Sequence, residues 1–208
     1  MGQSVYQASL VRKAGISAEE LRIEVLRKGI HLLIAAVPTI AGIAGVRPTL
    51  VVLALGTLFY TLCETLRMAG KPVPLISRVT SLAARRRDAG KFVLGPVTLG
   101  IGAMLALTLY PNPAASVAIY SLAFGDGLSS LVGKTFGTIR LPFTGGKSLE
   151  GSLTCFIAVF VSAFALTGKA LPSMVVALIA TLTEAMPLKD LDNIILPFVA
   201  GAFAYMLF

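Results

Sequence analysis

Charged side chains are scarce in this sequence. Asp, Glu, Lys and Arg make up 13% of the 208 residues, about half the fraction that a soluble globular domain carries. Tryptophan is absent, histidine occurs once, and the two cysteines, Cys63 and Cys155, both fall in apolar runs. Two cysteines so placed predict neither a disulfide framework nor a zinc site. With 56% hydrophobic residues, this composition excludes an ordinary soluble domain and indicates an integral membrane protein.

Acidic residues are outnumbered by basic ones, and 18 Lys and Arg against 10 Asp and Glu give a formal net charge of +8. The basic residues lie in short segments between apolar runs instead of forming one patch. This distribution favours contact with anionic lipid headgroups and disfavours a nucleic-acid partner. The first 28 residues also lack the apolar stretch of a signal peptide.

Seven apolar runs have lengths near those of membrane-spanning helices. Their approximate bounds are 29–46, 49–66, 92–110, 114–132, 151–168, 171–187 and 193–208. They predict an all-α fold, a polytopic membrane helix bundle of about seven transmembrane helices, forming one integral membrane domain over residues 1–208. Residues 1–28 are expected to form a cytoplasmic or interfacial segment.

Two further helices are predicted outside these runs. Residues 17–28 begin with the capping-box pair Ser17 and Glu20, and this helix either lies at the membrane interface or extends the first span. Residues 73–83 carry apolar side chains at helical spacing and precede the basic residues 85–87, which is typical of an interfacial helix.

The loops that carry most Lys and Arg alternate with loops that carry few. The N-terminal segment and the segments after the second and fourth runs are basic, whereas the intervening ones hold little more than Arg47 and Lys169. The positive-inside rule therefore predicts a cytoplasmic N-terminus and an external C-terminus. Nearly all the unusual polar residues then fall on the cytoplasmic side.

An acid stands in the fourth apolar run. Asp126 lies between Gly125 and Gly127, and a carboxylate in a spanning segment costs free energy, which indicates a functional role. Glycine neighbours let a ligand approach closely, and Mg²⁺ typically binds one or two carboxylates together with substrate phosphates. We expect Asp126 to bind a metal; an acid paired with a nearby Lys or Arg inside the bundle is the alternative.

The turn before the last run supplies further oxygen ligands. Asp192 and Asn193 follow Asp190, and Glu184 lies about one turn inside the preceding run. These side chains either complete a metal site with Asp126, in which Asp192 is the second ligand, or bind ribose hydroxyls. A solvated acidic loop is the alternative.

Several cationic residues are placed to bind phosphate. Arg27 and Lys28 share one helical face with Glu24 and His31, although an ordinary interfacial cluster is the alternative. Lysines also stand beside small residues in Gly133-Lys134 and in Gly146-Lys147-Ser148. Neither segment has the glycine spacing of a P-loop, but lysines hold phosphate oxygens without that fold.

The order of these motifs resembles the polyprenol kinase family, which includes dolichol kinase, phytol kinase and the CTP-dependent diacylglycerol kinase. The resemblance runs from about residue 22 to 200, and its motifs are Arg27-Lys28-x-x-His31, Gly125-Asp126-Gly127 with Gly133-Lys134 and Gly137, Lys147-Ser148-x-Glu150-Gly151-Ser152, Glu184, and Asp192-Asn193 with Pro197. Relatives often carry alanine where Gly127 stands. The resemblance implies that a lipid alcohol receives the terminal phosphate of a nucleoside triphosphate, usually CTP.

We accordingly expect a CTP-dependent lipid-alcohol kinase whose active site opens at the cytoplasmic face, with a polyprenol-, phytol- or diacylglycerol-like acceptor and membrane lipids as its other partners. The expected catalytic residues are Asp126, Lys147, Glu150 and Glu184; the expected nucleotide and phosphate ligands are Arg27, Lys28, Gly125, Gly127, Gly133, Lys134, Ser148 and Asn193; the expected Mg²⁺ ligands are Asp126 and Asp192.

Two other functions stay open at this point. A phosphatidate cytidylyltransferase also uses CTP at a membrane and would use the same residues. A transporter is a weaker alternative, since it would need polar residues through the midplane, and here they gather near one face. The sequence does not distinguish CTP from ATP and does not predict the oligomeric state.

Overall fold

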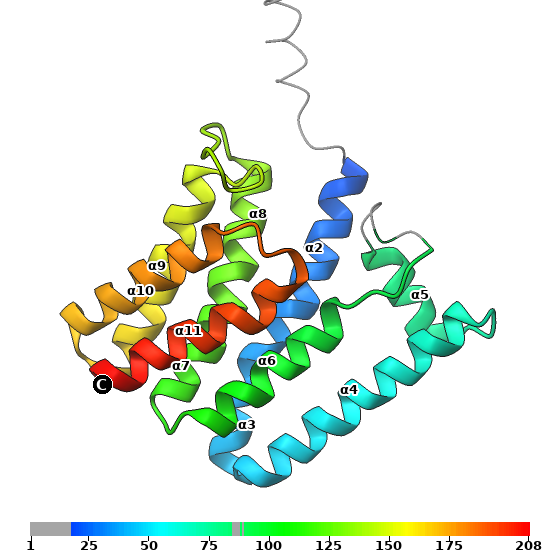
Figure 1. Ribbon diagram of the computed structural model, residues 1–208, viewed down its shortest axis with the longest axis horizontal. Helices are drawn as coiled ribbons and strands as arrows, with labels where there is room; N and C mark the ends of the chain where they lie inside the picture. The colour runs from blue at the N-terminus through cyan, green and yellow to red at the C-terminus, as the bar shows by residue number, and fades with distance from the viewer. Residues whose placement is uncertain (1–17, 85–87, 89) are drawn as a thin grey trace, which may run out of the picture.

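The computed structural model describes residues 18–84, 88 and 90–208, and this part of the chain is helical (Figure 1). Its α-helices are α2 (Ala18–Leu32), α3 (Val37–Ala44), α4 (Val46–Met68), α5 (Pro74–Ala83), α6 (Gly95–Leu109), α7 (Ala114–Tyr120), α8 (Gly127–Thr135), α9 (Leu149–Thr167), α10 (Ala170–Ala185) and α11 (Asp192–Leu207). Short helices of other types join some of them: η1 (Leu33–Ala36), η3 (Ser121–Asp126) and η4 (Lys189–Leu191). The predicted all-α class is confirmed.

Each of the seven predicted apolar runs forms a helix or a continuous series of helices. Within the described residues, five helical stretches are long and apolar enough to cross a membrane: Glu20–Ala44, Val46–Met68, Ala114–Thr135, Leu149–Thr167 and Lys189–Leu207. Gly95–Leu109 and Ala170–Ala185 are shorter apolar helices. Many large apolar side chains are exposed along these helices, for example Leu33, Val52 and Leu58. Such a surface requires a lipid environment, and the protein is a polytopic membrane protein.

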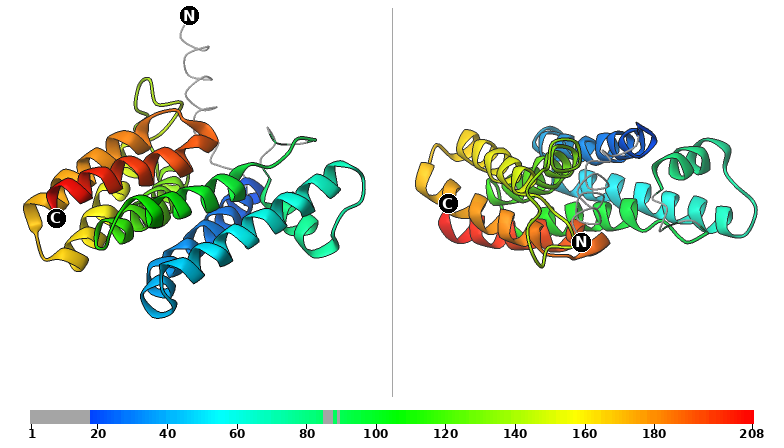
Figure 2. Two further views of the ribbon diagram at one scale, coloured as in Figure 1. Left: turned by 60° about the horizontal axis from the view of Figure 1, so that its bottom comes forward. Right: turned by 90° about the horizontal axis from the view of Figure 1, so that it is seen from above.

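The helices form two layers. One contains α9, the α7–α8 series and the α2–α3 series, and the other contains α10, α11, α6 and α4 (Figures 1 and 2). Helix pairs α9–α10 and α3–α4 connect the layers at the two sides of the bundle. Helix α5 lies at one edge, where it packs against α2 and α4.

The helical stretch from Ala114 to Thr135 is the centre of the bundle, since two thirds of its most apolar segment is buried. Within it, the backbone of Ser121–Asp126 widens into a π-helical turn. Such turns occur frequently at functional sites. Asp126 ends this turn and therefore lies on the most buried of the five long apolar stretches among the described residues.

Some helices cross each other closely at positions where one of them has a glycine. A Cβ atom at Gly102 in α6 would lie 2.0 Å from the backbone oxygen of Asn193 in α11, and one at Gly201 would lie 2.3 Å from the Tyr110 ring. Small residues at such positions let membrane helices approach each other closely. The α6–α11 contact fixes the position of Asp192 and Asn193 at the start of α11.

The two additional helices are present. Helix α5 matches the predicted interfacial helix over 73–83, although the basic residues 85–87 lie outside the described residues. The N-terminal helix continues through η1 into α3, so it extends the first span. The apolar run alone placed the start of this span too late, because Glu24, Arg27 and Lys28 interrupt the hydrophobic pattern. Ser17, its expected cap, lies outside the described residues.

Candidate active site

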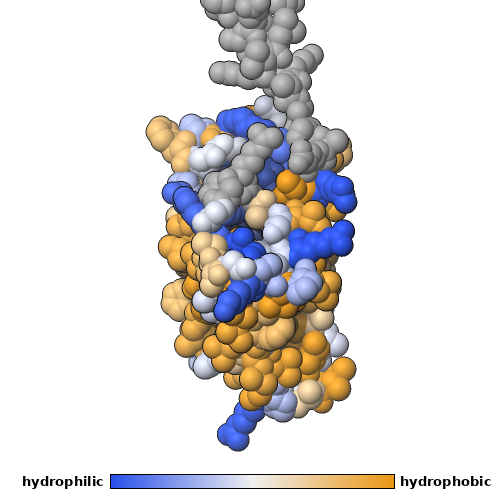
Figure 3. Space-filling model, turned by 90° about the vertical axis from the view of Figure 1, so that its right-hand side faces the viewer, coloured by the Kyte–Doolittle hydropathy of each residue, from blue (hydrophilic) through white to orange (hydrophobic). Residues whose placement is uncertain are grey.

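Polar side chains gather at one end of the bundle. Figure 3 shows hydrophobic residues over most of one side of the molecule and hydrophilic residues near its upper end. The residues that meet at this end come from α2, η3, α8, the start of α9, the end of α10 and the start of α11. Segments far apart in the sequence therefore contribute to a single site.

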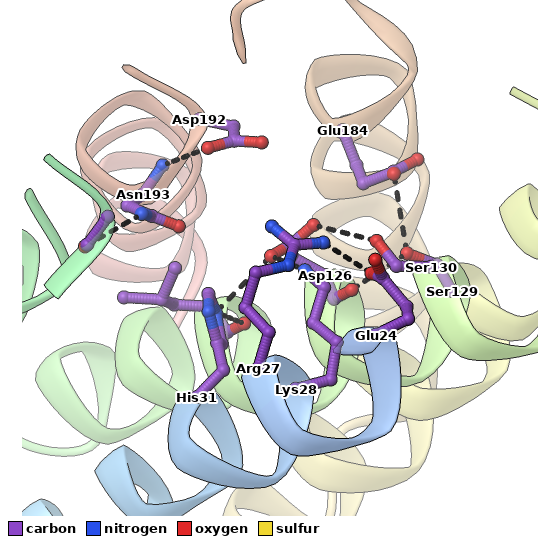
Figure 4. Close-up of polar contacts among 12 residues, drawn as sticks. Glu24, Arg27, Lys28, His31, Asp126, Ser129, Ser130, Glu184, Asp192 and Asn193 are labelled. Carbon is purple, nitrogen blue, oxygen red and sulfur yellow. Dashed lines mark hydrogen bonds and ion pairs between the residues drawn. The ribbon is translucent and has the colours of Figure 1, made fainter. Parts of the chain in front are cut away.

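Asp126 is the centre of a buried charged cluster (Figure 4). Lys28 from α2 donates a hydrogen bond to Asp126 Oδ2, and both side chains are buried. His31 Nε2 lies 3.3 Å from the same oxygen and 3.0 Å from the carbonyl oxygen of Leu122. Two acceptors facing Nε2 place the proton of a neutral imidazole on that nitrogen. Asp126 Oδ1 accepts a hydrogen bond only from Ser130 Oγ, at 3.4 Å, among the described residues.

A second group of charges surrounds the first. Glu24 is buried in α2 and binds both Arg27, one turn ahead, and Lys134 at the end of α8. The Nε atom of Arg27 is buried and has no hydrogen-bond partner among the described residues. A buried donor without a partner is costly, so Arg27 has capacity to bind an additional anionic ligand.

Lys147 connects the loop before α9 to the end of α10. Its Nζ atom lies 2.7 Å from Glu184 Oε1 and also donates to the backbone oxygen of Glu184. Ser129 Oγ donates to the same carboxylate at 3.3 Å. Glu184 is buried while the Lys147 side chain is 27% exposed, so the lysine is held in a fixed position with part of its surface accessible.

The loop over residues 139–148 is turned back on itself by backbone hydrogen bonds between Leu141 and Lys147 and between Leu149 and Ile139. Gly145 and Gly146 have φ values of +70° and +98°, which favour glycine. Ser148 caps α9 by accepting a hydrogen bond from the Gly151 amide at 3.2 Å. The loop therefore places Lys147 immediately before the positive end of a helix dipole, where anions bind favourably.

A cavity of about 410 Å³ lies among these elements. Eight expected site residues line it: Arg27, Asp126, Gly133, Lys134, Lys147, Ser148, Glu184 and Asp192. Gly146, Gly151 and Ser152, which belong to the same motifs, also border it. We call it the polar cavity. Asp126, Lys147 and Asp192, which the sequence analysis assigns to one site, all border this space.

A second cavity of about 350 Å³ adjoins the first. Its lining surface is mostly apolar, and we call it the apolar cavity. Residues of α2, α4, α5 and α6 form its walls, and Thr80, Asp88 and Asp190 also border it. Arg27, Asp126, Lys189 and Asp192 line both cavities. These four residues define the junction between a charged space and an apolar one.

The junction fits a divalent cation that is bound together with phosphates. Asp126 and Asp192 both line it, which supplies the one or two carboxylates that Mg²⁺ usually takes from a protein. Asp192 Oδ1 accepts the Asn193 amide at 2.9 Å. The described residues contain no group of three or more His, Cys, Asp or Glu that would hold a metal unaided, so phosphate oxygens would have to complete the coordination.

Several expected site residues take structural positions. Gly125 and Gly127 line neither cavity; Gly125 packs against Val159 of α9, and Gly127 packs against Leu32. Lys28 contacts Asp126 and lines neither cavity. In this structure these three residues contact neighbouring side chains and do not border the space in which a phosphate would bind.

Glu150 and Asn193 also form internal contacts. Glu150 lies outside both cavities and accepts hydrogen bonds from Thr138 and from the Ile139 amide, which fixes the loop. Asn193 donates to Thr98 Oγ1 at 2.9 Å and to the Gly95 oxygen at 3.3 Å, and it lines the apolar cavity instead of the polar one.

Two lining residues are not among the expected site residues, although Ser152 belongs to the motif that begins at Lys147. Ser152 Oγ is buried in the polar cavity without a hydrogen-bond partner among the described residues. Lys189 adopts a positive φ of 57° at the junction, a strained conformation that occurs often at functional sites. Its position after Pro187 was the available signal. No sequence signal marked the apolar residues of α4 and α5 as lining the site, because they face it only after the chain folds.

Together these features define a polytopic membrane protein with a charged, phosphate-compatible site at one end of its bundle. No protein-family model matches the chain, and no solved structure matches it. Several curated proteins match the chain. The chain is 35% identical over 113 residues to a probable chloroplastic phytol kinase of Triticum aestivum, a match covering 47% of this chain and 38% of the relative.

Two other relatives extend the comparison. The chloroplastic farnesol kinase of Arabidopsis thaliana is 27% identical over 142 residues, which is 60% of this chain and 46% of that protein. The dolichol kinase of Homo sapiens is 30% identical over 154 residues, 66% of this chain and 28% of that protein. The chain thus spans less than half the length of these three relatives. The similarities confirm the resemblance to the polyprenol kinase family that the motifs indicate.

Proposed function

We propose that this protein is a lipid-alcohol kinase that transfers the terminal phosphate of a nucleoside triphosphate, CTP, to the hydroxyl of a membrane alcohol at the cytoplasmic face. The observation that carries the proposal is the junction of the two cavities. A charged space and an apolar space meet at Arg27, Asp126, Lys189 and Asp192, as a reaction between a triphosphate and a lipid requires. The relatives named phytol, farnesol and dolichol kinase support the same reaction class.

The triphosphate occupies the polar cavity. Lys147, in the loop before α9, and Lys134, at the end of α8, line this space together with Arg27. Phosphoryl transfer depends mainly on positioning and on neutralising charge, and these cations supply both. Glu184 positions Lys147 through their ion pair, and the Ser152 hydroxyl, which has no hydrogen-bond partner in the described part of the chain, offers a donor to a phosphate oxygen.

Asp126 and Asp192 are the residues that would hold Mg²⁺. When bound there, the ion would neutralise charge on the phosphate oxygens, as it does in other phosphoryl-transfer enzymes. Lys28 and His31 fix Asp126 from behind through Oδ2. Its Oδ1 atom is left facing the space lined by Ser130, which is the side on which a ligand would bind.

The reaction joins the alcohol oxygen to the γ-phosphorus and breaks the bond to the β–γ bridging oxygen, which leaves with the nucleoside diphosphate. The proton of the hydroxyl is released to solvent water. Arg27 is central here because it lines both cavities and because no residue in the described ranges accepts a hydrogen bond from its Nε. It can therefore contact the phosphoryl group as it passes from donor to acceptor.

The position of a radioactive phosphate separates the kinase from the alternative cytidylyltransferase. The purified protein is incubated with Mg²⁺ and a panel of phytol, farnesol, polyprenol, dioleoylglycerol and phosphatidate, with CTP labelled at either the α- or the γ-phosphorus. A kinase labels an alcohol from γ-labelled CTP only, whereas a cytidylyltransferase labels phosphatidate from α-labelled CTP only.

The same panel with ATP, GTP and UTP identifies the donor. A protein that elutes as a single folded species and transfers no γ-phosphate to any alcohol would contradict the proposal. Transfer from ATP with none from CTP would retain the kinase and correct the donor.

A further inference from the structure

Glu24 is a buried acid that has no part in the proposed reaction as described so far. It is 1% exposed and belongs to the first long apolar stretch, Glu20–Ala44. A carboxylate in such a stretch costs free energy unless cations compensate it, and its presence indicates a functional role. Glu24 lines neither cavity, so it does not border a ligand in either of them. A functional role for Glu24 therefore acts through the residues that it contacts.

The two oxygens of the Glu24 carboxylate bind different cations. Oε1 accepts a hydrogen bond from Arg27 Nη2, and Oε2 accepts one from Lys134 Nζ. Arg27 lies one turn ahead on α2, where Figure 4 shows its guanidinium beside the Glu24 carboxylate. Lys134 belongs to the last turn of α8. One buried carboxylate thus joins two helices through their cations.

Both of these cations line the polar cavity. The Arg27 side chain is 24% exposed and the Lys134 side chain is 41% exposed, so each contacts Glu24 and still borders the cavity. Long side chains lose conformational entropy when they are fixed, and the ion pairs with Glu24 supply that fixation before a ligand binds. Two cations share one carboxylate, so the group keeps a net positive charge for an anionic ligand.

Lys147 is held in a comparable way. It also lines the polar cavity, and the buried Glu184 binds it at 2.7 Å. These three cavity cations therefore each have a carboxylate partner. A ligand with several negative charges would find them already in place, and such preorganisation increases affinity because less ordering is needed on binding. Without Glu24, Arg27 and Lys134 would repel each other and turn toward solvent.

We propose that Glu24 is a positioning residue, which fixes Arg27 and Lys134 for the binding of a polyphosphate chain in the polar cavity. The inference rests on the proposed function for the identity of this chain as that of a nucleoside triphosphate. Binding of an inorganic polyphosphate needs neither a base nor an alcohol, and this allows a separate test.

The test measures equilibrium binding of inorganic tripolyphosphate to the full chain in detergent with Mg²⁺, by titration calorimetry. Glu24→Gln removes the charge and keeps the shape. Glu64→Gln is the matched control, because Glu64 is also 1% exposed and binds an arginine three residues ahead, yet lines neither cavity. We expect the dissociation constant to rise at least about tenfold in Glu24→Gln, as for the loss of a hydrogen bond to a charged group. In Glu64→Gln, which shares no partner with the cavity cations, it should stay within about twofold of the original. Equal affinities in the two variants would overturn the proposal.

A second variant covers the case in which Glu24→Gln fails to fold. Glu24→Asp keeps the negative charge and withdraws the carboxylate by one methylene group, so it weakens the contacts to Arg27 and Lys134 without leaving their charges unbalanced. We expect a folded protein by thermal unfolding and a dissociation constant for tripolyphosphate that is about threefold higher or more. An unchanged constant in this variant would also overturn the proposal.

Steady-state kinetics separate positioning from a general loosening of the fold. We expect Glu24→Gln to raise KM for the nucleotide about tenfold and KM for the alcohol much less, because Lys134 lines only the polar cavity. An equal rise in both KM values would show a structural role and contradict the positioning role.

The two proposals fail in different ways. Weaker binding of tripolyphosphate to Glu24→Gln, in a protein that transfers no phosphate from any nucleotide, would support the positioning role and contradict the kinase. Transfer of phosphate by Glu24→Gln with an unchanged KM for the nucleotide would support the kinase and contradict the positioning role.

Discussion

Single residues in this protein combine structural and chemical roles, and Asp126 does so most clearly. Its Oδ2 atom neutralises the buried Lys28, and its Oδ1 atom faces the polar cavity. Removing one member of a buried ion pair leaves an uncompensated charge, which costs about 3–5 kcal/mol. An activity assay on Asp126 variants therefore needs a parallel measurement of stability.

We expect Asp126→Asn to lower the unfolding temperature in detergent and to abolish phosphoryl transfer. In the double variant Lys28→Met/Asp126→Asn neither charge remains, so stability should recover while activity does not. Differential scanning fluorimetry and the γ-label assay measure the two properties. Recovery of activity in the double variant would show that Asp126 serves only to neutralise Lys28.

A substitution of Lys147 is expected to have a more specific effect, on the kinetics with one of the two substrates. Lys147→Met removes a cation from the polar cavity, and loss of one group that stabilises developing charge typically costs 10²–10³-fold in rate. We expect kcat/KM for the nucleotide to fall by roughly that factor, with KM for the alcohol unchanged. Steady-state kinetics with each substrate varied in turn would show this, and an equal rise in both KM values would contradict the assignment to the phosphate side.

At the scale of elements, the crossing of α6 and α11 places Asp192 at the junction of the cavities. This crossing relies on the close approach at Gly102 and the hydrogen bonds of Asn193 to Thr98 and Gly95. The site on α11 thus depends on the packing of α6, although α6 contributes no charged side chain to it.

We predict that Gly102→Ala lowers stability by about 1–3 kcal/mol, the usual cost of inserting volume into a packed contact. Gly56→Ala is the control, since a Cβ atom there meets nothing within 4 Å, and alanine favours the helix over glycine. Thermal unfolding of both variants in one detergent would compare them. Equal unfolding temperatures would contradict the tight crossing.

A substitution of Glu64 tests whether the segment before α6 shapes the apolar cavity. Glu64→Ala removes the acceptor for the Val93 amide and the partner of Arg67. We expect KM for the alcohol to rise at least about tenfold, the factor that corresponds to the loss of one hydrogen bond to a charged group, with KM for the nucleotide unchanged. A change in the nucleotide KM alone would show that the network supports the other cavity.

At the scale of the whole molecule, the distribution of charge predicts the orientation. Thr144 lies in the loop of the site, and Lys169 lies at the opposite end of α9 and α10. We expect a membrane-impermeant maleimide added to intact cells to label Lys169→Cys and to spare Thr144→Cys until the cells are opened. The native Cys63 and Cys155 are buried and give a low background. The reverse pattern would invert the topology.

The sequence predicted the helices well because hydrophobic length is a local property. Apart from the first run, whose helix begins earlier than expected, the runs and the amphipathic helix α5 appear near their expected bounds. The pairing of Lys28 with Asp126 and the width of the apolar cavity could not be predicted, since they depend on how the helices pack. Gly125 and Gly127 show the same limit: a motif predicts that glycine is needed, while only the packing shows that neighbouring helices need it.

The junction of the cavities lies at one end of the bundle. Under the proposed function, this position confines the reaction to one face of the membrane. An alcohol in the opposite leaflet cannot reach Asp126 and Asp192 until its hydroxyl crosses the bilayer. Once phosphorylated, its head group is charged and crosses hydrocarbon at a high free-energy cost. The protein would then convert an exchanging pool of neutral alcohol into a pool of lipid phosphate confined to one leaflet.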